Sequence, residues 1–245
     1  MMPKINVYVP DDLAAAVKAA GIPVSAVCQR ALAQAVHAVG QARRVVETIR
    51  DPDFTPDRLP SLDRVGNGVT PRLARALELA RQAAGAAGVV ESRHLLLGML
   101  DERDNLGVRV LESLEVDTDG LRAAAAAASD SPEPGPAYVA DPTSVWSGLS
   151  VPARLAIASA LESALALGHN YLGCEHLLLG LADGTSSAGE LLAARGVDAA
   201  SARRAVGAAT TGYAHARQAA ATTSPDLSDI VARLERLERR LGTEE

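Results

Sequence analysis

A stretch with the sequence GHNYLGCEHLLLGL, residues 168–181, constrains the fold most strongly, because a diverged copy of it lies upstream. The copy is GVVESRHLLLGML, residues 88–100. The first glycines of the two copies are 80 residues apart and their histidines are 82 apart, so the first copy lacks counterparts of His169 and Asn170. A repeat on this scale indicates two similar units that stack and bury a common core.

Helix signals surround both copies in the same order. Thr70 followed by Pro71 predicts a helix start, with a hydroxyl N-cap and proline at the first helical position. Ser150 takes the equivalent place in the second unit. Aromatic residues make up only 2% of the chain, which favours a core of close-packed aliphatic helices. We therefore expect a mainly α protein, with repeats at 68–128 and 147–211 in one domain spanning 68–211.

Residues 1–50 have a different pattern. Residues 4–9 alternate polar and apolar side chains, which predicts a half-buried strand with Lys4, Asn6 and Tyr8 on its outer face. Asp11 or Asp12 is expected to cap a helix that runs to about residue 20, and Ser25 to cap a second that runs to about residue 49. A lone strand leaves its edge unpaired, so we expect pairing with a second copy.

This order of elements resembles the ribbon-helix-helix DNA-binding family, in which two chains form an antiparallel ribbon that enters the major groove. The resemblance implies a homodimer whose outward strand residues, Lys4, Asn6 and Tyr8, contact bases. It also implies a phosphate at the start of the second helix, beside Ser25. The net charge of residues 1–50 is +3, against −9 for the remainder, which fits a polyanionic partner. The alternative is a dimerisation arm without a DNA role.

Two further segments are expected to lie outside the packed units. Residues 51–67 contain three prolines and no hydrophobic period, so they are predicted to be a linker that lets the parts on either side move independently. Residues 212–245 begin with small polar residues and end with leucines and isoleucine at heptad spacing. That spacing predicts a short C-terminal helix of coiled-coil type.

The tandem repeat resembles the N-terminal repeat domain of the Clp unfoldase ATPases, especially the C type, whose motif is G-H-N-Y-[IL]-G-T-E-H-[IL]-L-L-G-L. The second copy departs from that motif at Cys174, where the family has threonine. The resemblance implies an eight-helix bundle with pseudo-twofold symmetry. It also implies that this bundle receives substrates, adaptors and, in C-type members, phosphoarginine-marked proteins.

The ligand site follows from the same resemblance. The family contacts the guanidinium group of phosphoarginine through the glutamate of its E-H pair, and Glu175 with its neighbour Cys174 matches that position in the second repeat. The first repeat has Arg93 there, which reverses the charge, although Arg93 could meet a phosphate instead. His94 and His176 invite a catalytic or metal-binding interpretation, but we favour a structural role in tying the loop to the bundle.

Several function classes are not expected. The only lysines are Lys4 and Lys18, so the sequence contains no G-x-x-x-x-G-K phosphate loop. No nucleophile elbow or ligand cluster is present, so we predict no enzyme activity, no catalytic residues, no metal and no cofactor. Cys28 and Cys174 lie far apart in apolar helical contexts, which suits reduced thiols. No signal peptide or membrane-spanning run is evident, so a cytoplasmic location without membrane partners is expected.

Two functions remain open. The first is a non-enzymatic regulator, similar to the short C-type Clp-like proteins of actinobacteria. Its Clp-type receptor would bind marked proteins, adaptors, Clp-directed antibiotics or other ligands shared with a Clp unfoldase, and its DNA-binding head would repress transcription, including that of its own gene. The second is an adaptor or decoy that acts only through protein and ligand contacts, with the head used for dimerisation.

Overall fold

The computed structural model describes residues 5–51, 68–85, 88–128, 148–183 and 186–223. Within these ranges the regular elements are helices, joined by two isolated β-bridges. The first helices are α1 (Asp11–Ala19) and α2 (Val24–Arg50). The repeats contribute α3 (Pro71–Ala84), α4 (Ser92–Glu102), α5 (Leu106–Ser113), α6 (Thr118–Ala127), α7 (Val151–Ala166), α8 (Cys174–Ala182), α9 (Ser187–Ala193) and α10 (Ala199–Thr223).

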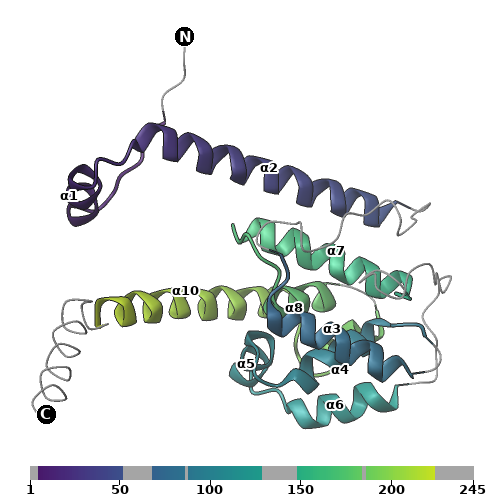
Figure 1. Cartoon of the computed structure of the whole chain (residues 1–245). Helices are drawn as coiled ribbons and strands as arrows, with labels where there is room; N and C mark the ends of the chain where they lie inside the picture. The colour runs from purple at the N-terminus through teal and green to yellow at the C-terminus, as the bar shows by residue number, and fades with distance from the viewer. Residues whose placement is uncertain (1–4, 52–67, 86–87, 129–147, 184–185, 224–245) are drawn as a thin grey trace, which may run out of the picture.

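Helices α3 to α10 form the eight-helix, two-unit bundle that the resemblance to the Clp family implies (Figure 1). Side-chain caps fix several helix starts. As expected, Thr70 accepts from Leu73 and Ser150 accepts from Ala153, and Asp117 accepts from Gly120 in the same way. The N-cap of α4 is Glu91 and that of α8 is Gly173, which occupy equivalent positions in the two repeats. The same local signals therefore produce the same elements twice.

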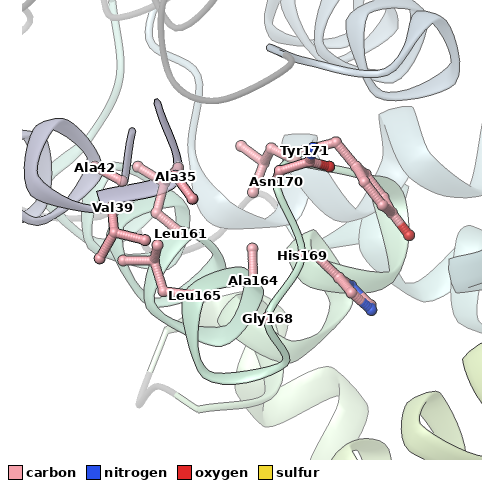
Figure 2. A pocket seen from close by; sticks show the side chains of 11 residues that line it. Ala35, Val39, Ala42, Leu161, Ala164, Leu165, Gly168, His169, Asn170 and Tyr171 are labelled. Atoms are coloured by element: carbon pink, nitrogen blue, oxygen red, sulfur yellow. The ribbon is translucent and has the colours of Figure 1, made fainter. Parts of the chain in front are cut away.

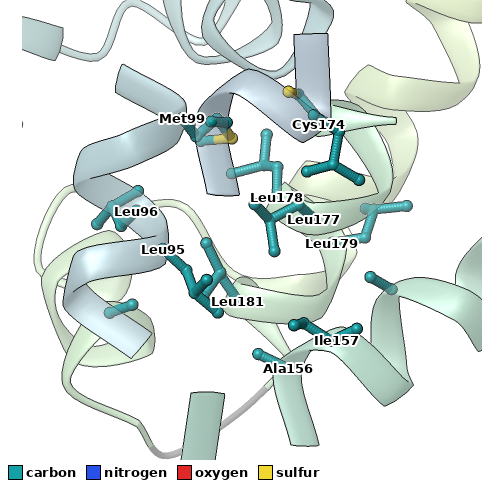
Figure 3. Packing of buried hydrophobic residues seen from close by; sticks show 14 of the residues in the cluster. Leu95, Leu96, Met99, Ala156, Ile157, Cys174, Leu177, Leu178, Leu179 and Leu181 are labelled. Atoms are coloured by element: carbon teal, nitrogen blue, oxygen red, sulfur yellow. The ribbon is translucent and has the colours of Figure 1, made fainter. Parts of the chain in front are cut away.

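The centre of the bundle is the pair α4 and α8. Leu95, Leu96 and Met99 of α4 are almost fully buried, as are Leu177 and Leu178 of α8 (Figure 3). These helices come from the two LLLG motifs, whose glycines bring each helix close to its neighbour. Burial of aliphatic side chains at about 25 cal/mol per Å² is the main force that holds the two repeats together.

The repeats also exchange short backbone contacts. The Thr70 N–H donates to Leu172 O at 2.9 Å, and in the other direction the Ser150 N–H donates to Val90 O at 2.9 Å. Each repeat therefore begins against the loop of the other repeat. The start of the first repeat therefore lies beside the loop of the second repeat.

Helix α2 was expected to move independently of the bundle, but its C-terminal half packs on the bundle. Val45, Val46 and Ile49 of its C-terminal half are buried against the bundle, and Arg50 pairs with Glu162 of α7 at 2.8 Å. The N-terminal half of α2 and the whole of α1 extend past the bundle (Figure 1). The expectation that the parts on either side of residues 51–67 move independently is wrong for this half of α2, because its apolar stripe continues to Ile49 and needs a surface to cover it.

Residues 5–19 also differ from the structure that the sequence predicts. Residues 5–9 form no strand in the single chain, and the side chains of Ile5 and Val7 are 76% and 66% exposed. A ribbon needs a partner backbone, so the predicted strand stays a prediction about the dimer. Helix α1 starts after Pro10, with both aspartates in its first turn instead of at the N-cap.

The C-terminal end of the bundle extends further than expected. Helix α10 continues to Thr223, past the boundary predicted at residue 211, because the sequence there is rich in alanine and contains no proline. The predicted heptad helix and residues 52–67 of the predicted linker lie outside the described residues. No helix within the described ranges is long and apolar enough to cross a bilayer.

Candidate functional site

Histidine fixes the start of the central helix in each repeat. The Nδ1 atom of His176 accepts the Gly173 N–H at 3.0 Å, and Nδ1 of His94 accepts the Glu91 N–H at the same distance. Both rings are buried. Each histidine thus satisfies a backbone donor at the N-cap, which is a structural role.

The tautomer of His176 follows from these contacts. Since Nδ1 accepts a hydrogen bond, the proton of the neutral ring lies on Nε2, which donates to Nδ1 of His169 at 2.8 Å. Burial, together with His169, lowers the pKa of His176 to about 3. The ring is therefore neutral at pH 7.

Three side chains in this region could in principle hold a metal ion, since ligand atoms of His169, Glu175 and His176 lie within 4.8 Å of one another. Metal coordination through Nε2 of His176 would move the ring proton to Nδ1, where it would oppose the Gly173 N–H. A histidine ligand normally uses its second nitrogen as a donor to a carbonyl or carboxylate, which is the reverse of this arrangement. The contacts of His176 therefore fit a hydrogen-bonded cluster and not a metal centre.

Glu175 is a buried carboxylate without a cationic partner among the described residues. The residue is 5% exposed, and its Oε1 lies 3.7 Å from Nδ1 of His176. That nitrogen cannot donate to the carboxylate because it accepts from Gly173. A Cβ atom at position 173 would lie 2.4 Å from Oε2 of Glu175, so glycine makes room for the carboxylate. A buried charge of this kind is costly unless a partner arrives.

The carboxylate lines a cavity of about 600 Å³. From α3 and the α5 region the cavity receives Arg72, Asp104 and Arg109, and the second-repeat loop contributes His169 and Tyr171. The remaining lining residues are Thr70, Asn105, Leu106, Cys174, Glu175 and Thr210. The site therefore combines both repeats.

Charges in this cavity are arranged in two groups. Arg72 bonds to Glu102 at 2.7 Å and to Asp104, and Arg109 bonds to Asp104 at 2.9 Å. The hydrogen bond that Arg72 donates to Glu102 is the largest cause that raises the pKa of Arg72. Glu175 lies apart from this network. A ligand that joins a cationic and an anionic group could contact both.

Cys174 also lines the cavity, as predicted, but its thiol is not activated. Burial raises the pKa of Cys174 far above its ordinary value, and the nearby carboxylates of Glu102 and Glu175 act in the same direction. The thiol is therefore protonated at pH 7 and serves as a small apolar wall.

The equivalent position of the first repeat is closed by an internal ion pair. Nε of Arg93 donates to Glu91 at 2.6 Å, and the two side chains are only 15% and 11% exposed. Glu91 stands where the second repeat has Gly173. The first repeat thus places its own guanidinium group against its own carboxylate.

The predicted DNA-contacting residues are only partly described. Tyr8 is 94% exposed and Asn6 is also exposed, whereas Lys4 lies outside the described residues. Ser25 does not cap α2, because Pro23 is the N-cap and Ser25 lies inside the first turn. The start of α2 therefore carries no side-chain cap.

The sequence reasoning missed Arg72, Asp104 and Arg109. They belong to the first repeat, about 66 to 103 residues before Glu175, and reach it only because the repeats cross. The signal available was the repeat itself, since a twofold arrangement sets the start of one unit against the loop of the other.

The bundle is a tandem helical-repeat domain whose pocket contains residues from both repeats. The chain matches the family of the Clp repeat (R) N-terminal domain over residues 66–139 and 148–245, and it belongs to that family. Residues 3–50 match a second family, the post-segregation antitoxin CcdA. Neither of these two families describes a catalytic domain.

Parts of the chain are also similar to individual proteins. An uncharacterized protein of Mycobacterium tuberculosis is 37% identical over 117 residues, which are 46% of this chain and 42% of that protein. The chaperone protein ClpB of Corynebacterium diphtheriae is 37% identical over 134 residues, or 54% of this chain and 15% of ClpB. The chain thus spans less than half the length of these relatives. The N-terminal domain of the chaperone ClpD from Arabidopsis thaliana is 22% identical, with a TM-score of 0.43, and the match covers 56% of this chain and 91% of that domain.

Proposed function

We propose that this chain is a non-enzymatic regulator of Clp-dependent proteolysis, with a receptor bundle and a DNA-binding head. The observation that carries the proposal is Glu175, a buried carboxylate that has no cationic partner among the described residues and lines an open cavity. Membership of the Clp repeat family supports a role in binding substrates or adaptors of a Clp unfoldase. A cytoplasmic location, where such partners work, belongs to the same proposal.

The ligand of this receptor is an arginine-type group. A guanidinium group offers planar donors that match a carboxylate, and a charged hydrogen bond of this kind contributes about 1.5–3 kcal/mol. The first repeat supports the assignment from within the chain, because Arg93 already sets such a group against Glu91. In phosphoarginine the phosphate would face Arg72 and Arg109, which line the same cavity.

Titration of the full-length chain with phosphoarginine tests this receptor role. Glu175→Gln removes the charge with little change in shape, and we expect affinity to fall by about tenfold or more. Glu112→Gln removes an exposed carboxylate from α5 that does not line the cavity, and serves as the matched control. Unchanged binding by the Glu175 variant would contradict the assignment of the ligand.

The head is proposed to bind DNA as a dimer and to repress transcription. The match of residues 3–50 to an antitoxin family and the exposed apolar side chains of this segment support that role. Tyr8 and Asn6 are free to reach bases, and the uncapped N–H groups at the start of α2 suit a phosphate.

Fluorescence anisotropy with DNA from the chain's own promoter region separates this proposal from the adaptor or decoy alternative. We expect Lys4→Ala and Tyr8→Ala to weaken specific binding by about 1–3 kcal/mol each. Gln34→Ala, a change at an exposed position of α2, is the control and should have no effect. A wild-type chain that forms dimers but binds no DNA specifically would favour the adaptor.

A further inference from the structure

A second cavity, of about 150 Å³, lies where α2 passes the second-repeat loop (Figure 2). Its first wall is α2, with Ala35, Val39 and Ala42, and its second wall is α7, with Leu161, Ala164 and Leu165. The loop from Gly168 to Leu172 closes the third side. The cavity is therefore built from the head helix and the receptor bundle together.

The cavity has a clear origin in the sequence. Farther along the same face of α2, Val45, Val46 and Ile49 close fully onto the bundle. Toward the loop, Ala35 and Ala42 of α2 and Ala164 of α7 line the cavity. Their side chains are too small to fill the space between the helices. The loop wall contains His169 and Asn170, the two residues that the first repeat lacks.

The loop separates this space from the Glu175 cavity. His169 and Tyr171 line both cavities with different parts of the residue, and Figure 2 shows their side chains directed away from α2. Asn170 is exposed at the edge and makes no hydrogen bond with the described residues. Its amide thus offers both a donor and an acceptor beside an otherwise apolar space.

Size and lining identify the kind of occupant. An apolar cavity of about 150 Å³ gives water few partners and accepts a molecule the size of benzene. One polar group at the edge suits a single hydrogen-bonding substituent on such a ring. A charged or strongly polar molecule would lose its hydration against the methyl groups of Ala35, Val39 and Leu165.

We propose that this junction cavity is a second ligand site, for a small apolar molecule with one aromatic ring and one hydrogen-bonding substituent. The molecule would contact α2 and the 168–172 loop at once, and would stabilise the packing of α2 on the bundle. The site is independent of the charge at Glu175.

Methyl NMR of the full-length chain, labelled at alanine, valine and leucine, tests the proposal with 4-methylphenol and toluene as probes. We expect saturable shifts at the methyl groups of Ala35, Val39 and Ala164 with both probes. Ala35→Leu fills the cavity from an exposed helix position and is expected to weaken both probes about tenfold or more. Ala33→Leu, exposed on the opposite face of α2, is the matched control and should bind as the wild type does.

Two further variants sharpen the result. Asn170→Ala is expected to weaken 4-methylphenol about two- to tenfold, the value of one hydrogen bond, and to leave toluene unchanged. Glu175→Gln should leave both probes unchanged, so failure of the phosphoarginine proposal would not affect this one. Absence of saturable shifts in the wild type, or equal binding by Ala35→Leu, would overturn the proposal.

Discussion

Glu175 and Arg93 occupy equivalent positions in the two repeats, 82 residues apart, and carry opposite charges. Arg93 is paired with Glu91 at 2.6 Å, whereas no lysine or arginine among the described residues forms an ion pair with Glu175. The twofold fold is therefore chemically asymmetric. One repeat supplies its own guanidinium group, and the other is open to one from outside.

Reversal of charge at Arg93 tests this asymmetry. Arg93→Glu sets two carboxylates side by side in a largely buried place, so we expect the free energy of unfolding to fall by about 3 kcal/mol, measured by urea denaturation. The variant should not gain a second phosphoarginine site, because the loop before it still lacks the two residues that match His169 and Asn170. A stable variant with two sites would show that the loop is unimportant.

Replacement of Gly173, the residue before Cys174, tests the position of the Glu175 carboxylate. A Cβ at Gly173 would meet the flexible end of Glu175 at 2.4 Å, so Gly173→Ala should displace the carboxylate and weaken phosphoarginine binding about tenfold. Thermal unfolding should change little, since a side-chain end can move. A variant with normal affinity would mean that the carboxylate binds from another position.

The glycines of the two LLLG motifs behave differently. A Cβ at Gly180 would lie 2.0 Å from the backbone oxygen of Ala156, and one at Gly98 would lie 2.1 Å from that of Ala76. A backbone oxygen in a packed helix cannot move aside, so each change to alanine should destabilise the bundle by about 3 kcal/mol or more. Denaturation of Gly98→Ala and Gly180→Ala checks this, with Gly207→Ala as control, because a Cβ at this partly buried position of α10 would meet nothing within 4 Å.

The low pKa of His176 predicts a loss of stability in mild acid. The folded ring has a pKa of about 3 and the unfolded ring one near 6.5, so the unfolded state binds more protons between these values. Stability is complete above the unfolded value and falls as the pH drops, by about 2 kcal/mol between pH 7 and pH 5. Urea denaturation at the two pH values should show this difference in the wild type and a smaller one in His176→Asn.

Dimer formation is expected to depend on the head. Ile5, Val7 and Val9 are exposed in the single chain, and apolar side chains at this density need a partner surface. Sedimentation at micromolar concentration should show a dimer for the full chain and monomers after deletion of residues 1–10. A monomeric full-length chain would contradict both the ribbon and the proposed DNA binding.

Local sequence signals predicted most of the bundle, because its caps and repeats are short-range features. Thr70, Ser150 and Asp117 cap their helices as their residue types indicate. The packing of α2 on α7 could not be predicted in the same way. The apolar stripe of α2 shows that something covers it, but a stripe does not identify its partner.

In the candidate site, too, the sequence predicted the residue that lies within a local motif and missed those that long-range packing brings in. Glu175 was predicted from a motif contained in one segment, and its burial without a cation fits that prediction. Arg72 and Arg109 were not, because they belong to the other repeat and reach the cavity through long-range packing, such as the contact between Thr70 and Leu172 and that of α5 with α8. The same long-range arrangement produces the junction cavity between α2 and the loop.

Calorimetric titration of the full-length chain with phosphoarginine measures the central claim most directly, because it counts sites as well as affinity. The account predicts one site per chain in the wild type, one in Glu112→Gln, and none detectable at the same concentrations in Glu175→Gln. Two equivalent sites per chain, or one site that survives Glu175→Gln, would contradict the account.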